Sequence, residues 1–169
     1  MSYLTVLLNS FHKKQQFTCG KKQLDNYLHT QAKQDVKRRL TACFILSDDD
    51  YNVQGFYTLS GTAIQRKLLP ENIIRKLPPS YDNLPATLLG RLAIDISYKG
   101  QGLGELLLVD ALKRSYDTSL NSVGAMAVIV DPIDKDAVKF YLKYGFILLP
   151  DSAKMFISIE TIAELLKEK

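Results

Sequence analysis

Three glycines stand at alternate positions, Gly100, Gly102 and Gly104, within the segment LAIDISYKGQGLGELL (92–107). The residues before them form an apolar run typical of a strand, and those after them follow a helical pattern. Glycines let the backbone turn tightly so that N–H groups converge, and the start of a helix adds a partial positive charge. Lys99 adds a further cation beside the loop. The segment therefore predicts a cradle for an anionic group, and the alternative is a plain turn from strand to helix.

This loop differs from two common phosphate-binding motifs. No G-x-x-x-x-G-K-[ST] sequence occurs in it, which excludes a P-loop. Glu105 occupies the position that the third glycine of a G-x-G-x-x-G fingerprint would take, so a dinucleotide fold is not indicated either.

A tyrosine provides a second candidate group for chemistry. Tyr141 lies in KDAVKFYLKYGF (135–146), where Ala137, Phe140, Tyr141 and Tyr144 follow helical spacing. A phenol has a pKa near 10, so it is protonated at pH 7 and can donate a proton. Helical spacing alone also fits a Tyr141 that is simply packed in the core. Tyr144 has the same spacing and is interpreted as a packing residue.

Positive charge is clustered in two segments. The first, residues 13–39, holds eight basic residues against Asp25 and Asp35. The second holds four basic residues against Glu71. These segments either attract a polyanion or form solvated faces. The basic residues are Lys13, Lys14, Lys21, Lys22, Lys33, Lys37, Arg38 and Arg39, followed by Arg66, Lys67, Arg75 and Lys76.

The remaining candidates are weaker. Cys19 and Cys43 have no histidine close in sequence, and two cysteines cannot form a four-ligand zinc site by themselves, so we expect no catalytic thiol and no metal. His12 and His29 fall in the basic segment and are expected to be exposed. The run at 48–50 is expected to be an acidic turn, because it lacks the other residues of a calcium loop.

The composition is that of an ordinary globular protein. The chain has 169 residues, 46% hydrophobic and 24% charged, with a formal net charge of +4. This length predicts a single domain over residues 1–169. The composition excludes a disordered chain, a collagen-like repeat and a coiled coil. With no apolar run near 20 residues and no signal-like start, we expect no membrane association and a cytoplasmic location.

Hydrophobic patterning predicts an α/β (α+β) domain with a mixed sheet. An early hairpin makes the sheet mixed, and four prolines between residues 66 and 87 predict an irregular excursion with one or two helical turns. The expected strands are 2–8, 41–46, 53–64, 86–95, 125–131 and 154–162. The expected helices are 23–36, 103–119 and 135–146.

Two of these segments together resemble the GNAT superfamily, the Gcn5-related N-acetyltransferases. The loop Lys99-Gly100-Gln101-Gly102-Leu103-Gly104 is similar to the family's [RQ]-x-x-G-x-[GA] diphosphate motif, with lysine at the first position. The segment that starts at Asp134 and contains Tyr141 and Gly145 is similar to N-x-x-A-x-x-[FL]-Y-x-x-x-G-F, with aspartate in place of asparagine.

The resemblance implies a fold and a set of site residues. It implies a splayed pair of parallel central strands with acetyl-CoA as cosubstrate, its diphosphate on residues 99–104. Its pantetheine arm would pair with the backbone of Leu92, Ala93 and Ile94, with the N–H near Ile94 polarising the thioester. Asp134 would lie on the cofactor side, and Tyr141 would protonate the leaving sulfur. No general base is indicated.

The first half resembles a GNAT subgroup that contains toxins acetylating the amino group of aminoacyl-tRNA. The partners implied are charged tRNA and a small DNA-binding antitoxin, and a homodimer is compatible with this interpretation. The tRNA phosphates would contact Lys37, Arg38, Arg39, Arg66 and Lys67. Arg91 would either face the substrate or pair with Asp95 on the same strand face.

Three alternatives to this function stay open. The acceptor could instead be a small-molecule or protein amine. The chain could be a non-catalytic acyl-CoA-binding module, although Tyr141 and the intact glycine loop argue against that. A purely nucleic-acid-binding protein would account for the charge and leave the glycine loop without a role.

Overall fold

A computed structural model describes residues 2–168 of the chain. The sheet has seven strands in the order β1-β2-β3-β4-β5-β7-β6. The residues divide into two compact units, each built from separate stretches of chain. The first consists of residues up to Ser60 with Leu89–Arg114, and the second of Gly61–Leu88 with Ser115 onward. The single-domain expectation stays a prediction.

Antiparallel strands form the sheet of the first unit. Strand β1 (Val6–Leu7) pairs with β2 (Ala42–Ser47), and β2 pairs with the first part of β3 (Val53–Gln65). Asp48 closes the turn between β2 and β3, because its Oδ1 accepts the backbone N–H groups of Asp50 and Asn52 at 3.0 and 2.9 Å. The hairpin predicted from the acidic turn is therefore confirmed.

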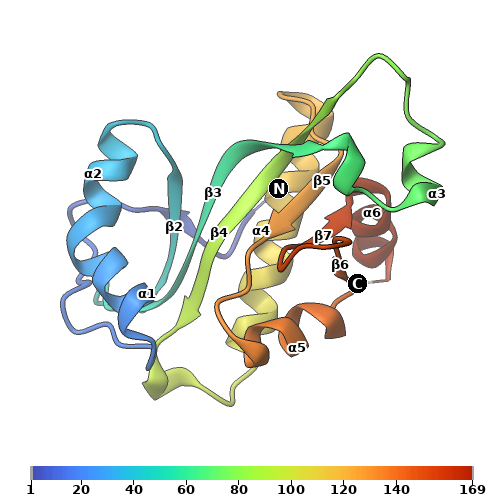
Figure 1. Ribbon diagram of the computed structural model, residues 1–169. Coiled ribbons are helices and arrows are strands. Elements are labelled where there is room, and N and C mark those ends of the chain that lie inside the picture. Colours follow the sequence, from blue (N-terminus) through green and yellow to red (C-terminus); the bar gives the residue numbers. More distant parts are fainter. Residues whose placement is uncertain (1, 169) are drawn as a thin grey trace. The chain divides into compact units, whose positions relative to one another are not determined.

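One helical segment packs beside β2 in the first unit (Figure 1). It consists of α1 (Lys22–Asn26), the π-helical turn Tyr27–Gln31 and α2 (Ala32–Lys37). Its buried face joins a core that includes Phe17, Leu28 and Phe56. The sequence predicts this helix but contains no signal for the π-helical turn, which packing in the folded protein selects.

The second unit contains the parallel strand pair. The start of β4 (Asn83–Ile94) pairs in parallel with β5 (Ala127–Val130). Strand β7 (Met155–Ser158) runs antiparallel to β5 and also pairs with β6 (Ile147–Leu148). All four residues of β5 are buried, as expected for a strand covered on both faces. Helices α5 (Lys135–Lys143) and α6 (Ile159–Lys167) belong to this unit, drawn in orange and red in Figure 1.

The proline-rich stretch is short and irregular, as predicted. It contains a 3₁₀ turn at Arg66–Leu68 and a single helical turn, α3 (Glu71–Ile74). After β4, a 3₁₀ turn at Ile96–Tyr98 leads through the glycine loop into α4 (Leu103–Asn121).

The expected strand 154–162 is wrong in its second half, where α6 begins at Ile159. Ser158 caps this helix, its Oγ accepting the N–H of Thr161 at 3.1 Å. The expected first strand is also shorter, because only Val6 and Leu7 form it.

A buried carboxylate ties the N-terminal segment to α4. Asp110 is 4% exposed and accepts hydrogen bonds from the Leu4 N–H at 2.7 Å, the Thr5 hydroxyl at 2.6 Å and the Tyr57 hydroxyl at 2.7 Å. Arg114 donates to the Tyr57 hydroxyl at 2.9 Å and to the Thr5 carbonyl at 2.7 Å. Every polar group of the cluster thus has a partner, which makes its burial favourable.

Replacing this carboxylate should destabilise the protein strongly. Asp110→Ala leaves two buried hydroxyls without their acceptor, so the free energy of unfolding should fall by about 3 kcal/mol. Tyr57→Phe removes the hydroxyl that donates to Asp110 and accepts from Arg114, but it leaves the carboxylate its other donors, so it should cost less, about 1–2 kcal/mol. Urea unfolding followed by circular dichroism measures both, and equal losses for the two variants would contradict the central role of Asp110.

Candidate active site

The glycine loop has open space beside two of its glycines. Gly100 and Gly102 have φ of +82° and +76°, a conformation that favours glycine, and a Cβ built at either meets no atom within 4 Å. Helix α4 begins at Leu103, immediately after the loop. The first N–H groups of a helix have no acceptor within the helix, so they can bind an anion together with the loop amides. The loop therefore fits the diphosphate cradle predicted from the sequence.

Lys99 and Asp95 fix the loop against the N-terminal segment. The Lys99 Nζ donates to the Cys19 carbonyl at 2.8 Å, so one of its three donors serves the structure and two remain for an anion. Asp95 is buried; its Oδ1 accepts the Ser97 N–H at 2.9 Å and its Oδ2 the Thr18 N–H at 3.0 Å. The end of β4, the start of the loop and residues 18–19 thus share one set of hydrogen bonds.

Arg91 lies over an aromatic ring. Its guanidinium carbon is 3.5 Å from the centroid of the Tyr27 ring, and the Tyr27 hydroxyl donates to Asp35 at 3.0 Å. Within residues 2–168, Arg91 makes no ion pair with Asp95. Of the two roles predicted for Arg91, the ion pair is therefore not formed. The cation–π contact fixes the guanidinium plane and leaves its N–H edges for a ligand.

The expected backbone contacts fall on the last part of β4. Leu92 and Ile94 are half-buried, and Ala93 between them is buried. These residues and the glycine loop belong to the first unit, whereas Asp134 and Tyr141 belong to the second.

Tyr141 has a hydroxyl without a partner. Its side chain is 7% exposed and its ring lies 5.3 Å from Phe140 and 5.1 Å from Phe146, centroid to centroid. The hydroxyl makes no hydrogen bond within residues 2–168, yet it is not among the polar atoms sealed from solvent. Burial raises the pKa of Tyr141 above that of an ordinary tyrosine, so its hydroxyl is protonated at neutral pH.

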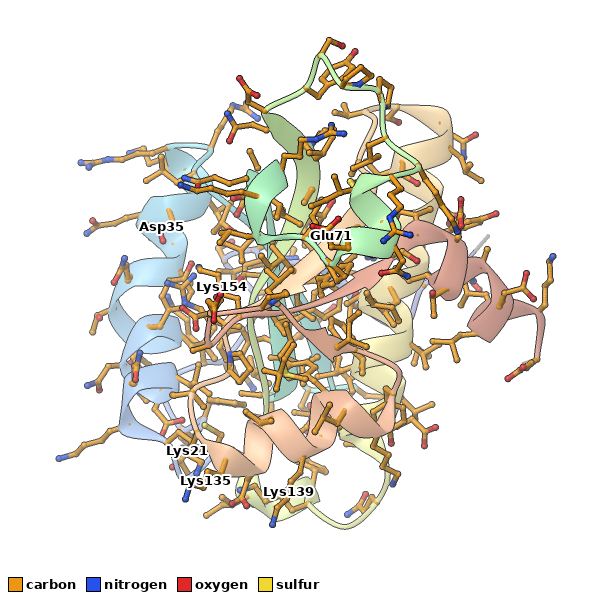
Figure 2. The ribbon with its side chains drawn as sticks, turned by 45° about the vertical axis from the view of Figure 1, so that its right-hand side comes forward. Lys21, Asp35, Glu71, Lys135, Lys139 and Lys154 are labelled. Atoms are coloured by element: carbon orange, nitrogen blue, oxygen red, sulfur yellow. The ribbon has the colours of Figure 1, made fainter. Side chains whose placement is uncertain are left out.

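Asp134 is the N-cap of α5. Its Oδ1 accepts the Ala137 N–H at 2.9 Å, which satisfies one of the helix's first amides. On α5, Lys135 and Lys139 are exposed and point outward in Figure 2. Tyr141 on the same helix is buried. The carboxylate of Asp134 therefore positions the helix that carries Tyr141.

The expected phosphate-binding residues differ in their environments. Lys37, Arg38 and Arg39 lie exposed at the C-terminal end of α2, where no hydrogen bond or ion pair from residues 2–168 fixes their side-chain charges. Lys67 is also exposed, in the second unit. Arg66 is different, because its two terminal nitrogens donate to four carbonyls at 2.6–3.2 Å. These carbonyls belong to Ile74, Leu77, Pro78 and Tyr81, so Arg66 holds the proline-rich stretch together.

The cysteines and histidines give no catalytic pair. Both cysteines are free and buried, and burial raises the pKa of Cys19 to about 11 and of Cys43 to about 12, so both are neutral thiols. His12 is 7% exposed and the His29 Nε2 lies 2.8 Å from the Phe17 carbonyl, so the expectation that both are exposed is wrong. Residues 2–168 contain no cluster of three metal-ligating side chains and no helix long and apolar enough to span a bilayer.

Sequence comparison gives relatives of this chain. The family described as Acetyltransferase (GNAT) domain matches residues 84–158. A tRNA-acetylating toxin of Mycobacterium tuberculosis is 33% identical over 134 residues, 79% of this chain and 78% of that protein. The chain belongs to the GNAT acetyltransferases. A probable toxin TacT of Sinorhizobium fredii is 30% identical over 92% of this chain and 90% of that protein.

Solved structures agree with this membership. AtaT complexed with acetyl-methionyl-tRNAfMet is 30% identical, with a TM-score of 0.88 over 98% of this chain and 99% of that one. A mutant AtaT toxin bound to the C-terminus of the antitoxin AtaR and acetyl-CoA is 27% identical, with a TM-score of 0.79 over 98% of both chains. This GNAT chain is therefore an N-acetyltransferase, and its mixed sheet with the parallel β4–β5 pair is the fold of these toxins.

Proposed function

We propose that this GNAT enzyme transfers the acetyl group of acetyl-CoA to the amino group of an amino acid carried on tRNA. In this proposal the enzyme is a toxin that acts in the cytoplasm, and its partner is a small DNA-binding antitoxin. The relatives named a tRNA-acetylating toxin and AtaT with acetyl-methionyl-tRNAfMet support this acceptor. The observation in this chain that carries the proposal is the protonated hydroxyl of buried Tyr141, which has no hydrogen-bond partner among residues 2–168.

The chain holds its cosubstrate with backbone groups. Acetyl-CoA supplies an acetyl group activated as a thioester. The amides of residues 99–104 and the first turn of α4 bind the diphosphate, with Lys99 adding charge. The backbone of Leu92, Ala93 and Ile94 pairs with the pantetheine arm, and the Ile94 N–H polarises the thioester carbonyl. Asp134 contributes through the position of α5 instead of by direct contact.

Tyr141 supplies the proton that the reaction needs. When the carbon–nitrogen bond forms and the carbon–sulfur bond breaks, the sulfur leaves as a thiolate. The Tyr141 hydroxyl donates its proton to that thiolate, and the acceptor nitrogen loses one proton to solvent. Solvent then returns a proton to the Tyr141 phenolate, so the enzyme ends the cycle as it began. The other buried tyrosines, Tyr27 and Tyr57, cannot do this because their hydroxyls already donate to Asp35 and Asp110.

The pKa of the acceptor amine favours an α-amino group over a lysine side chain. An α-amino group has a pKa of about 7.7–8.0, which leaves a neutral fraction at pH 7, whereas a lysine side chain has a pKa of about 10.4. A lysine acceptor would need a dedicated base, and no histidine or glutamate close to Tyr141 in sequence offers one. The exposed cations Lys37, Arg38, Arg39 and Lys67 would contact the tRNA phosphates, with Arg91 on the acceptor side.

A side chain in the glycine cradle should weaken cosubstrate binding. Gly102→Ala places a methyl group in the open space above the loop and strains a positive φ, so the Kd of acetyl-CoA should rise about tenfold or more. Gly124→Ala is the matched control, because its Cβ also meets nothing within 4 Å and its φ is ordinary. Calorimetric titration measures the Kd of acetyl-CoA for both variants. Equal affinities would show that the diphosphate does not bind at this loop.

Removing the Tyr141 hydroxyl should slow the chemistry alone. Tyr141→Phe keeps the ring packing, so acetyl-CoA affinity and stability should stay as they are, while kcat falls roughly 10²–10⁴-fold. Tyr144→Phe, on the same helix end, should have a much smaller effect. If both variants lose the same activity, the effect comes from packing and Tyr141 is not the acid.

Labelled acetyl-CoA tests the acceptor directly. The wild type should label charged tRNA and leave deacylated tRNA unlabelled. Lys37→Glu combined with Arg38→Glu should raise KM for charged tRNA without changing the affinity for acetyl-CoA, and should flatten its salt dependence. Labelling of a polyamine or a protein lysine in place of charged tRNA would refute the aminoacyl-tRNA acceptor and leave the acetyltransferase activity standing.

A further inference from the structure

A pocket of about 300 Å³ lies in the first unit, between the chain that follows β1 and helix α2. Its polar lining comes from Asn9, Ser10, His12, Lys14 and Lys33, and no acidic side chain lines it. None of these residues belongs to the glycine loop or to the end of β4. The pocket is therefore separate from the groups assigned above to acetyl-CoA.

His12 presents a fixed N–H group. Its Nδ1 lies 3.1 Å from the Asn9 backbone nitrogen, which can only donate, so Nδ1 must accept. Burial lowers the pKa of His12, so the ring is neutral at pH 7 and its hydrogen is on Nε2. The Asn9 Oδ1 accepts the Phe11 N–H at 2.9 Å, which leaves the side-chain amide of Asn9 as a donor.

Two lysines share the pocket without a carboxylate. Burial lowers the pKa of Lys14, and the charge of Lys33 lowers it further. The acid on α2 is Asp35, which is labelled in Figure 2. Its carboxylate already accepts the Tyr27 hydroxyl at 3.0 Å. An anion bound between the two ammonium groups would relieve their repulsion and offset the burial of Lys14.

We propose that this pocket binds a phosphomonoester group. Such a group carries a charge of about −1.5 to −2 at pH 7 and three strong acceptor oxygens. Two ammonium groups match that charge, and the His12 N–H, the Ser10 hydroxyl and the Asn9 amide match the oxygens. No tyrosine, phenylalanine or tryptophan lines the pocket to stack a base, so the phosphate is the recognised element.

Two molecules offer this chemistry. One is the 5′-terminal phosphate of the tRNA, which lies at the same end of the molecule as the amino acid, and this source rests on the proposed function. The other is a free mononucleotide or inorganic phosphate, which would make the pocket a separate ligand site.

Titration with inorganic phosphate tests the pocket by itself. Dephospho-coenzyme A, which keeps the diphosphate but lacks the 3′-phosphomonoester of coenzyme A, is added to saturation so that the glycine loop is occupied. Ionic strength is kept constant with chloride. Lys14→Met and Lys33→Met should each weaken phosphate binding about tenfold or more. Lys22→Met, an exposed lysine on α1 outside the pocket, should leave the Kd within about twofold. If the two pocket variants bind phosphate as the wild type does, the proposal is overturned.

A comparison of two charged tRNAs then identifies the source. If the terminus occupies the pocket, tRNA with a 5′-hydroxyl should show a higher KM than tRNA with a 5′-phosphate, and Lys33→Met should abolish the difference. Equal KM values, with phosphate and AMP binding still dependent on Lys14 and Lys33, assign the pocket to a free nucleotide. If no charged tRNA is acetylated at all, the proposed function fails while the phosphate titration still decides the pocket.

Discussion

Within residues 2–168, the parallel pairing of β4 with β5 extends over only two register positions, Thr87–Val128 and Leu88–Ile129. Strand β4 continues for six more residues to Ile94, and within residues 2–168 these have no register with β5. Backbone polar groups on such an edge need a partner, which is why a ligand arm with amide groups suits it. At the end of this edge, Asp95 binds the amides of Ser97 and Thr18, and Lys99 binds the Cys19 carbonyl. The position of the glycine loop therefore depends on how β4 ends.

Local signals in the sequence explain what could be predicted. The glycine loop, α4 and α5 were predictable because glycine spacing, helical periodicity and a capping aspartate act over a few residues. The expected strand 154–162 is too long, because apolar residues continue from β7 into α6 and only the Ser158–Thr161 cap marks the start of the helix. The π-helical turn at Tyr27–Gln31 and the burial of His12 depend on contacts between distant segments. No pattern of neighbouring residues encodes such contacts.

The tyrosines show the same limit at the level of the site. Helical spacing places both Tyr27 and Tyr141 on buried faces, and burial raises the pKa of both. Their hydroxyls differ, because Tyr27 donates to Asp35 and Tyr141 has no partner within residues 2–168. A hydroxyl that already donates is committed to the fold, whereas an unpartnered one can donate to a reactant. Helical spacing alone therefore does not distinguish the two tyrosines. The resemblance of the segment around Tyr141 to a GNAT motif does, and the hydrogen bond of Tyr27 gives the physical reason.

Basic residues in this chain serve three different purposes, although all look alike in a count of charge. Arg66 donates to four carbonyls of the proline-rich stretch, so little of its hydrogen-bonding capacity remains for a nucleic acid. Lys37, Arg38 and Arg39 are exposed and unrestrained, which suits contacts with a mobile polyanion whose strength falls with salt. Lys14 and Lys33 share a pocket without a carboxylate, and Lys14 is partly desolvated there, so a bound anion would be screened less than at the end of α2. Because Lys14 is half-buried beside polar donors, the pocket can distinguish ligands by their shape as well as by their charge. The exposed cations at the end of α2 distinguish ligands by charge alone.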